Sequence, residues 1–85
     1  MAVYVDNYEA SFGRMVMSHM MADSTEELLA MADQIGVQRK WIQKAGTWQE
    51  HFDVCLSKRA KAVAAGAVEL SPKDLVRQMV GRRVR

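Results

Sequence analysis

The chain has 85 residues, a length that fits one domain with a small hydrophobic core. Apolar residues make up 49% and charged residues 26%, which is typical of a globular protein and argues against disorder. No apolar run approaches the roughly 18–20 residues that span a bilayer, so we expect no membrane insertion. The single cysteine, Cys55, excludes an internal disulfide and a four-cysteine zinc site. Asp6 interrupts the opening apolar run too early for a signal peptide, so we expect a cytoplasmic protein of a bacterium or a phage-infected host.

The net charge of +2 conceals two halves of opposite sign. Residues 1–36 contain six acids and one base, whereas residues 37–85 contain eleven bases and four acids. A basic half of this kind favours a polyanionic partner, although cations at the end of a helix also suit the negative end of its dipole. Three of the last four residues are arginine, which predicts a basic tail over residues 81–85 after a domain over residues 1–80.

Two strands are predicted in the N-terminal part of the chain. Ala2–Val5 is a short run of β-forming residues that ends at an Asp-Asn pair, which indicates a buried strand. Tyr8–Gly13 resembles a loop. Met15–Met21 is ambiguous between helix and strand, and we favour a strand with His19 on the same face as two of the methionines.

The clearest element is a helix from Ser24 to Ile35. Ser24 and Glu27 have the spacing of a capping box, in which each side chain bonds the backbone of the other. Apolar residues then recur at helical spacing, and Gly36 stands where a left-handed helix cap belongs.

The second half of the chain predicts an alternation of strands and helices. This alternation indicates a small single α/β domain, with a short and partly parallel sheet packed by about three helices. The expected elements are strands over Val37–Gln43, Phe52–Leu56 and Ala67–Leu70, a helix from Ser57 to Ala65, and a helix from Pro72 that ends at Gly81.

Four polar residues are candidates for catalysis or metal binding. Asp6 follows the first strand, at the carboxyl end where ligands gather in open α/β sheets. His51 and Asp53 lie two residues apart, so a strand would place them on one face with Cys55. Imidazole and carboxylate groups bind transition metals, which lower the pKa of a bound water. We expect Asp6, His19, His51 and Asp53 to line one pocket, as catalytic residues or as ligands of a divalent metal. The alternative is that they only form structural hydrogen bonds.

Aromatic and basic residues lie close together in the second half. Trp41 follows Arg39 and Lys40, and a ring beside cations is typical of sites that stack nucleic-acid bases. Lys58 and Arg59 stand at the start of a predicted helix, where backbone N–H groups attract phosphate. Core packing and simple solvent exposure are the alternatives for these side chains. The residues that we expect to contact a phosphate-bearing ligand are Arg39, Lys40, Trp41, Lys58, Arg59, Arg82 and Arg83.

Several short motifs fall in one order along the chain. They are Ala2-Val-Tyr-Val-Asp6, Ser18-His19-Met20, Glu26-Glu27-Leu28, His51-Phe52-Asp53 and Ala62-Val63-Ala64-Ala65-Gly66-Ala67. In this order they resemble a small bacterial and phage family, domain of unknown function 4031, up to about Leu70. The resemblance implies a short stand-alone protein without an established activity. The family usually has tyrosine where this chain has Phe52, and often a second aspartate where it has Asn7, which removes one carboxylate from a two-acid metal site.

Three functions remain open from the sequence. The first, which we favour, is binding of a phosphate-bearing ligand, either nucleic acid or a nucleotide. The second is a metal-dependent hydrolase or nuclease that uses the Asp/His cluster. Because only this function is catalytic, the sequence leaves open whether the chain is an enzyme. The third is an interaction protein that forms a homo-oligomer through a methionine-rich interface. Metal analysis separates the second function from the others, and salt-dependent binding to nucleic acid separates the first from the third.

Overall fold

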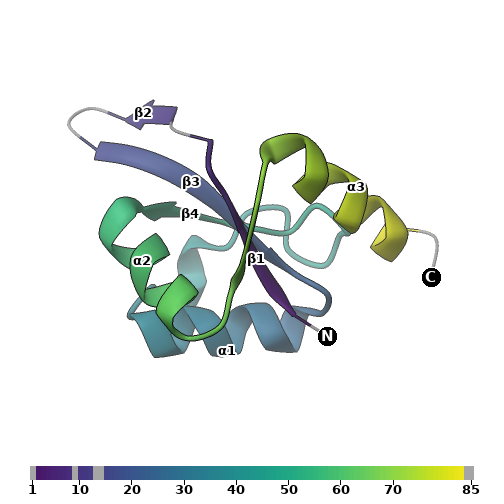
Figure 1. Cartoon of the computed structure of the whole chain (residues 1–85). Helices are drawn as coiled ribbons and strands as arrows, with labels where there is room; N and C mark the ends of the chain where they lie inside the picture. The colour runs from purple at the N-terminus through teal and green to yellow at the C-terminus, as the bar shows by residue number, and fades with distance from the viewer. Residues whose placement is uncertain (1, 9, 13–14, 84–85) are drawn as a thin grey trace.

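Five short strands and three α-helices alternate along the chain in a computed structural model, which describes residues 2–8, 10–12 and 15–83. The predicted α/β domain with a partly parallel sheet and three helices is therefore confirmed (Figure 1). The elements are β1 (Val3–Asp6), β2 (Ala10–Phe12), β3 (Met15–Ala22), α1 (Thr25–Ile35), the 3-10 helix η1 (Arg39–Trp41), β4 (Phe52–Cys55), α2 (Leu56–Ala64), β5 (Val68–Leu70) and α3 (Pro72–Arg83).

The centre of the sheet is β3, which pairs along both of its edges. Met20 lies opposite Val5 of β1 on one edge and opposite Phe52 of β4 on the other, and both pairings are antiparallel. β2 pairs with the first half of β3, on the same edge as β1. β5 runs parallel to β1 and lies at the far side of the sheet from β4.

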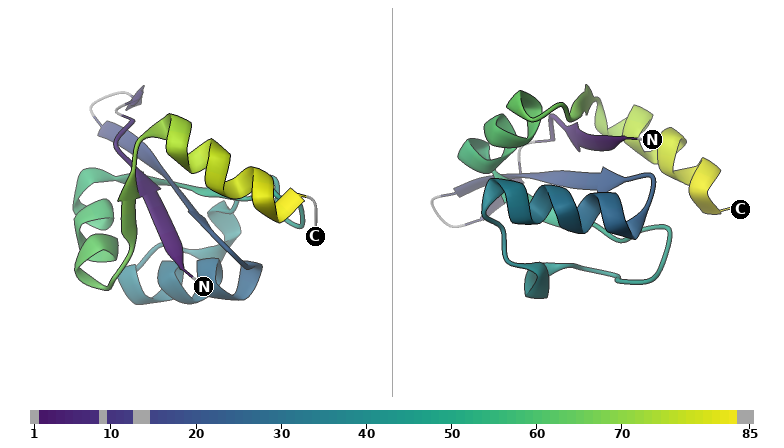
Figure 2. Two further views of the ribbon diagram at one scale, coloured as in Figure 1. Left: turned by 45° about the vertical axis from the view of Figure 1, so that its right-hand side comes forward. Right: turned by 90° about the horizontal axis from the view of Figure 1, so that it is seen from below.

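Helices cover both faces of the sheet, which explains why every residue of β1 is buried. α1 and α2 pack on one face, where Val3 and Val5 join the larger hydrophobic core with Phe52. α3 packs on the other face, where Leu75 and Met79 contact Tyr4. Figure 2 shows α1 and α3 on opposite sides of the sheet.

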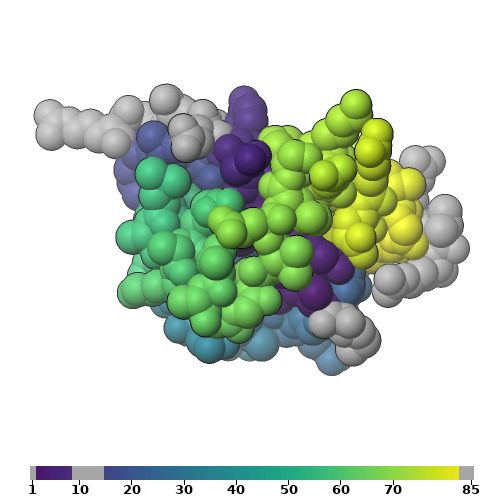
Figure 3. All heavy atoms as spheres, viewed as in Figure 1, coloured from purple at the N-terminus to yellow at the C-terminus, as the bar shows by residue number. Residues whose placement is uncertain are grey.

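The face that carries α3 is covered only in part. α3 packs mainly on β1 and β5, so the half of this face formed by β3 and β4 remains accessible. His19 and Asp53, on this uncovered half, have side chains that are 39% and 40% exposed. On the side of the molecule drawn in Figure 3, α2, β5 and α3 form a continuous surface with β1 visible between them.

The predicted ends of α1 are confirmed. The hydroxyl of Ser24 accepts a hydrogen bond from the backbone N–H of Glu27 at 3.2 Å and donates one to its carboxylate at 2.9 Å. Gly36 has a φ of 84°, a left-handed conformation that glycine adopts without strain. The capping signals in the sequence therefore act through local contacts alone.

Two predictions about the irregular segments are wrong. Tyr8–Gly13, predicted as a loop, contains β2, because β3 extends beyond β1 and leaves backbone groups that pair with Ala10–Phe12. The strand predicted over Val37–Gln43 is instead η1, followed by an isolated bridge between Gln43 and His51. Trp41, predicted within that strand, is 63% exposed.

Two predicted helix ends also differ from the structure. α2 begins at Leu56 with Cys55 as its N-cap, so Ser57 lies within the helix rather than capping it. α3 continues past Gly81 to Arg83, because Arg82 pairs with the buried Glu50 and gives the last turn a tertiary contact. Residues 84–85 and the side chain of Arg83 lie outside the described residues. No helix in the described ranges is long and apolar enough to cross a bilayer.

Candidate functional site

Asp6 ends β1 with a carboxylate that is almost completely buried. Its Oδ1 accepts hydrogen bonds from the backbone N–H groups of His19, at 2.9 Å, and Tyr8, at 3.3 Å. Its Oδ2 lies 2.8 Å from Nδ1 of the His19 ring. The backbone carbonyl of Asp6 accepts a further bond from Nε of Arg59 at 2.8 Å. Both carboxylate oxygens are thus engaged within the protein, and Asp6 holds His19 in place.

His19 lies on β3, directly opposite Asp53 of β4. The ring of Tyr8 stacks on the imidazole with centroids 5.6 Å apart. A carboxylate only accepts hydrogen bonds, so Nδ1 of His19 carries the proton that it donates to Asp6. The other ring nitrogen, Nε2, then has a free lone pair in the neutral imidazole, and it lies 3.9 Å from Oδ1 of Asp53.

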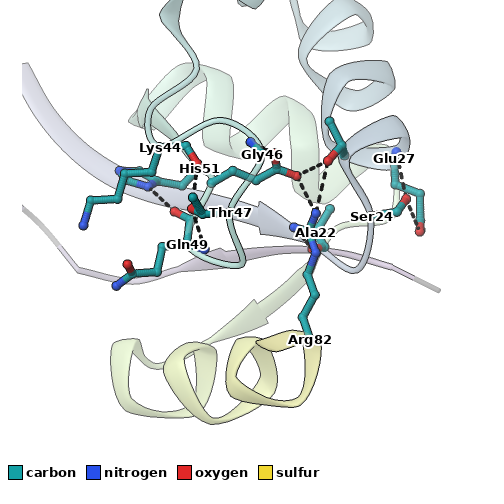
Figure 4. A network of polar contacts seen from close by, with 11 residues as sticks. Ala22, Ser24, Glu27, Lys44, Gly46, Thr47, Gln49, His51 and Arg82 are labelled. Atoms are coloured by element: carbon teal, nitrogen blue, oxygen red, sulfur yellow. Dashed lines mark hydrogen bonds and ion pairs between the residues drawn. The ribbon is translucent and has the colours of Figure 1, made fainter. Parts of the chain in front are cut away.

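His51 precedes β4 and is held by two backbone hydrogen bonds to Gln43. Its Nδ1 donates to the backbone carbonyl of Gln49 at 2.8 Å, a contact drawn in Figure 4. Its Nε2 lies 3.6 Å from Oδ1 of Asp53. The two imidazole rings meet edge to face, with centroids 5.6 Å apart. Both histidines therefore have Nδ1 engaged and Nε2 directed toward the same carboxylate oxygen.

Asp53 completes the cluster, and Gln43 orients it by donating to its Oδ2 at 2.8 Å. The distances from Oδ1 to the two histidines are too long for hydrogen bonds and suit a bridging water or ligand atom. The four residues predicted to lie together, Asp6, His19, His51 and Asp53, thus form one connected cluster. Within the described part of the chain, no group of three or more histidine, cysteine or acidic side chains has the geometry to hold a metal ion. A divalent metal here stays a prediction.

A pocket of about 270 Å³ lies between this cluster and α3, and we call it the α3 pocket. Asp6, His19 and His51 form part of its polar wall, together with Lys44 from the loop before β4. Trp48 from the same loop gives it an aromatic surface. The remaining lining residues are Met21, Gln49, Pro72, Leu75, Val76 and Met79.

A second hollow of about 330 Å³, which we call the Trp41 groove, lies on the other side of the cluster. Trp41 and Lys58 both line it, and Lys40 places its Nζ 5.1 Å from the centre of the Trp41 ring. Asp53 lines this groove and not the α3 pocket, so the prediction that all four polar residues line one pocket is wrong for Asp53. Asp53 nevertheless contacts both histidines of the α3 pocket. The α3 pocket and the Trp41 groove therefore adjoin at Asp53.

Three arginines predicted to bind phosphate are already paired with carboxylates. Arg39 contacts Asp33 at 2.7 Å on the surface, and its hydrogen bond lowers the pKa of Asp33. Arg59 contacts Glu69 at 3.0 Å. Arg82 reaches from the end of α3 to Glu50. Lys58 and Trp41 line the Trp41 groove and Lys40 lies over the Trp41 ring, whereas none of these three arginines lines either hollow.

Glu50 is a buried carboxylate that the sequence did not single out. Its oxygens accept hydrogen bonds from Arg82 and Thr25, each at 2.5 Å, and from the backbone N–H of Gly46 at 3.0 Å. Figure 4 shows Arg82 reaching across to Ala22 and the Gly46 loop. Burial raises the pKa of Glu50, but the hydrogen bonds outweigh it and hold the pKa below its usual value. This network fixes the loop that carries Lys44 and Trp48.

Cys55 lies at the edge of the Trp41 groove, as the N-cap of α2. Its Sγ is 3.3 Å from the hydroxyl of Ser57. The hydrogen bonds from the Ser57 side chain and from the backbone N–H of Lys58 lower the pKa of the Cys55 thiol. They stabilise the thiolate form.

The fold and the site define a small mixed α/β domain with a pair of histidines between two hollows of one sheet face. The chain belongs to the family described as protein of unknown function DUF4031, whose model matches residues 3–82. The resemblance drawn from the sequence motifs is thereby confirmed, and it extends beyond Leu70 into α3. No curated protein and no solved structure matches the chain significantly.

Proposed function

We propose that the protein binds a phosphate-bearing ligand, a nucleotide or a short stretch of single-stranded nucleic acid, across the α3 pocket and the Trp41 groove. The strongest support is the position of the two histidines, which lie between an aromatic and a basic residue on each side. Trp48 and Lys44 line the α3 pocket, and Trp41 and Lys58 line the Trp41 groove. Alternation of flat rings and cations suits a chain of bases and phosphates.

The lysines and histidines supply the groups that a phosphate requires. Among the described residues, neither Lys44 nor Lys58 makes an ion pair, so their ammonium groups are available to an anion. Nε2 of His19 and of His51 can each donate to a phosphate oxygen when protonated. The carboxylate of Asp53 opposes an anion, but it lies between the two imidazoles and is bonded by Gln43.

Trp41 is the residue with the clearest role in this proposal. The residue is 63% exposed, so the protein leaves a large apolar side chain in water beside Lys40. Stacking of a base on such a ring contributes about 1–3 kcal/mol, and the stack is tolerant of base identity. This surface favours a nucleobase over inorganic phosphate as part of the ligand.

Titration of a dye-labelled single-stranded oligonucleotide, followed by fluorescence anisotropy at several salt concentrations, tests the proposal. Trp41→Ala weakens binding about 5- to 150-fold at every salt concentration, as expected for a lost stack. Lys58→Ala weakens binding chiefly at low salt and reduces the slope against log salt by about one. Lys61→Ala, which removes an exposed cation of α2 outside both hollows, is the matched control and changes binding least.

Competition with an unlabelled mononucleotide distinguishes the two forms of the ligand. A mononucleotide that displaces the oligonucleotide at similar concentration indicates a nucleotide site. The proposal fails if the oligonucleotide and the mononucleotide do not bind, or if Trp41→Ala and Lys58→Ala bind as tightly as the unchanged protein.

A further inference from the structure

We propose that His19 and His51 act as an acid–base pair that cleaves RNA, an inference that rests on the proposed function. The two rings meet edge to face with centroids 5.6 Å apart, and both have Nδ1 engaged by an acceptor of the protein. Both Nε2 atoms lie within 4 Å of Asp53 Oδ1, so they face one small space. Two imidazoles that share a space, each free at one nitrogen, can remove one proton and supply another.

His19 is assigned as the base. Its Nδ1–H donates to the buried carboxylate of Asp6, which fixes the ring and leaves Nε2 as the acceptor. When Nε2 takes a proton, the negative charge of Asp6 stabilises the positive ring that forms, as in other carboxylate–histidine pairs. The other groups that face His19 are Tyr8, Asp53 and His51.

His51 is assigned as the acid. Its Nδ1 donates to the carbonyl of Gln49, and its Nε2 lies 3.6 Å from the partly exposed Asp53. A proton on Nε2 is therefore positioned at the wall of the α3 pocket, beside the space that His19 also faces. The charged or titratable groups around His51 are Asp53, His19 and Lys44, which lines the same pocket.

The reaction is an internal transfer of the phosphoryl group. His19 Nε2 removes the proton of a ribose 2′-hydroxyl, and the 2′-oxygen attacks the adjacent phosphorus. The bond from phosphorus to the 5′-oxygen breaks, and His51 gives its proton to that leaving oxygen. The products are a 2′,3′-cyclic phosphate and a free 5′-hydroxyl. Nothing is oxidised or reduced, and the two histidines regain their starting protonation by exchange with water.

The surroundings suit the charge that develops at phosphorus. Lys44 lines the same pocket and offers a cation to the phosphorus oxygens in the transition state. Trp48 and the exposed Val76 of α3, which both line the pocket, provide a surface for the base on one side of the scissile bond. The Trp41 groove holds the neighbouring nucleotide. DNA fits the same surface but lacks the 2′-hydroxyl, so the substrate class is RNA.

The test uses the full chain with an RNA oligonucleotide and a DNA oligonucleotide of the same sequence, in buffer with EDTA. Cleavage of the RNA is followed by gel and by mass spectrometry of the ends, and binding of the DNA is followed by anisotropy. We expect the RNA to be cut with 2′,3′-cyclic phosphate ends and the DNA to be bound intact. His19→Ala and His51→Ala each lower the cleavage rate by about 100-fold or more, and DNA binding remains measurable.

The pH dependence separates chemistry from a structural effect. The unchanged protein gives a bell-shaped profile of cleavage rate, in which the acidic limb reports the base and the alkaline limb reports the acid. His19→Ala removes the acidic limb, and His51→Ala removes the alkaline limb. Asp6→Asn, a change in the positioning residue, shifts the acidic limb as well as lowering the rate. Circular dichroism checks the fold, and His19→Gln and His51→Gln replace the alanine variants if those are unfolded.

The outcomes are distinguishable. If DNA is bound and RNA stays intact, the acid–base inference is overturned and the proposed binding function stands. If neither polymer binds, both fail. Cleavage that survives His19→Ala and His51→Ala, or that EDTA abolishes, also overturns the inference, because the activity then comes from a contaminant or needs a metal.

Discussion

Asp6 and Asp53 lie on the same face of the sheet and have different surroundings. Asp6 is 1% exposed and accepts two backbone N–H groups as well as the ring of His19. Asp53 is partly exposed, and within the described ranges the one hydrogen bond to its carboxylate is accepted at Oδ2, from Gln43. The buried carboxylate therefore serves to orient a ring, whereas the exposed one faces the space where a ligand enters.

At the same scale, Cys55 provides a test of local electrostatics. Because the Ser57 hydroxyl and the Lys58 N–H lower the pKa of the thiol, its thiolate forms at lower pH in the folded protein than in the unfolded chain. We expect alkylation by iodoacetamide to reach half its maximal rate at lower pH when the protein is folded. Ser57→Ala moves that midpoint upward. Equal midpoints for the folded protein and for the protein in urea would contradict this prediction.

At the scale of elements, α1 is defined by its two ends. Gly36 adopts its left-handed φ to close the helix, and an added Cβ would lie 3.1 Å from the Lys58 ammonium. The flexible lysine can move, so the conformational strain is the main cost. We expect Gly36→Ala to lower the free energy of unfolding by roughly 1 kcal/mol, measured by urea denaturation.

Gly81 provides a matched control, for which we expect the opposite change in the free energy of unfolding. It lies within α3, and an added Cβ would meet no atom within 4 Å. Because alanine is a better helix former than glycine, Gly81→Ala raises the free energy of unfolding by about 0.5–1 kcal/mol. If both substitutions changed the free energy of unfolding in the same direction, the left-handed conformation at Gly36 would not be the cause of the effect of Gly36→Ala.

At the scale of the molecule, Glu50 and Arg82 join segments that are distant in sequence. The pair links the end of α3 to the start of α1 and to the Gly46 loop. Removing one partner of a buried pair leaves an uncompensated charge, so Arg82→Ala costs about 3–5 kcal/mol in a protein whose total is about 5–15 kcal/mol. Thermal and urea unfolding measure this loss, and Arg77→Ala, at an exposed ion pair of α3, is the control.

The same network predicts how stability depends on pH. The pKa of Glu50 is lowered in the folded state from its ordinary value of 4.5. Its contribution is therefore present above about pH 4.5 and is lost as the pH falls through the lower folded value. Glu50→Gln should make the free energy of unfolding less dependent on pH between about 5 and 3. An unchanged acid dependence in this variant would contradict the role of Glu50.

Local signals in the sequence determined the elements that depend on neighbouring residues. The N-cap at Ser24, the cap at Gly36 and Pro72 at the start of α3 are all short-range features, and the structure confirms them, although Glu27 bonds the hydroxyl of Ser24 in place of its backbone N–H. Alternation along a strand predicted that His51 and Asp53 share one face, and the positions of Asp6 and His19 on or beside predicted strands favoured a common pocket. These residues were therefore expected to lie together before any tertiary contact was known.

Only the tertiary structure decided which of these groups are engaged and which face a ligand. β2 forms because β3 extends beyond the end of β1 and leaves backbone groups without a partner strand. Arg82 pairs with Glu50, which lies 32 residues away in the sequence. The carboxylate of Asp6 is engaged within the protein because the backbone N–H groups of Tyr8 and His19 donate to it. No residue spacing in the sequence predicts these hydrogen bonds. The free energy of burying a charged or polar group depends on partners from distant segments. A sequence pattern can therefore name the candidate residues, but the packing of those segments assigns their roles.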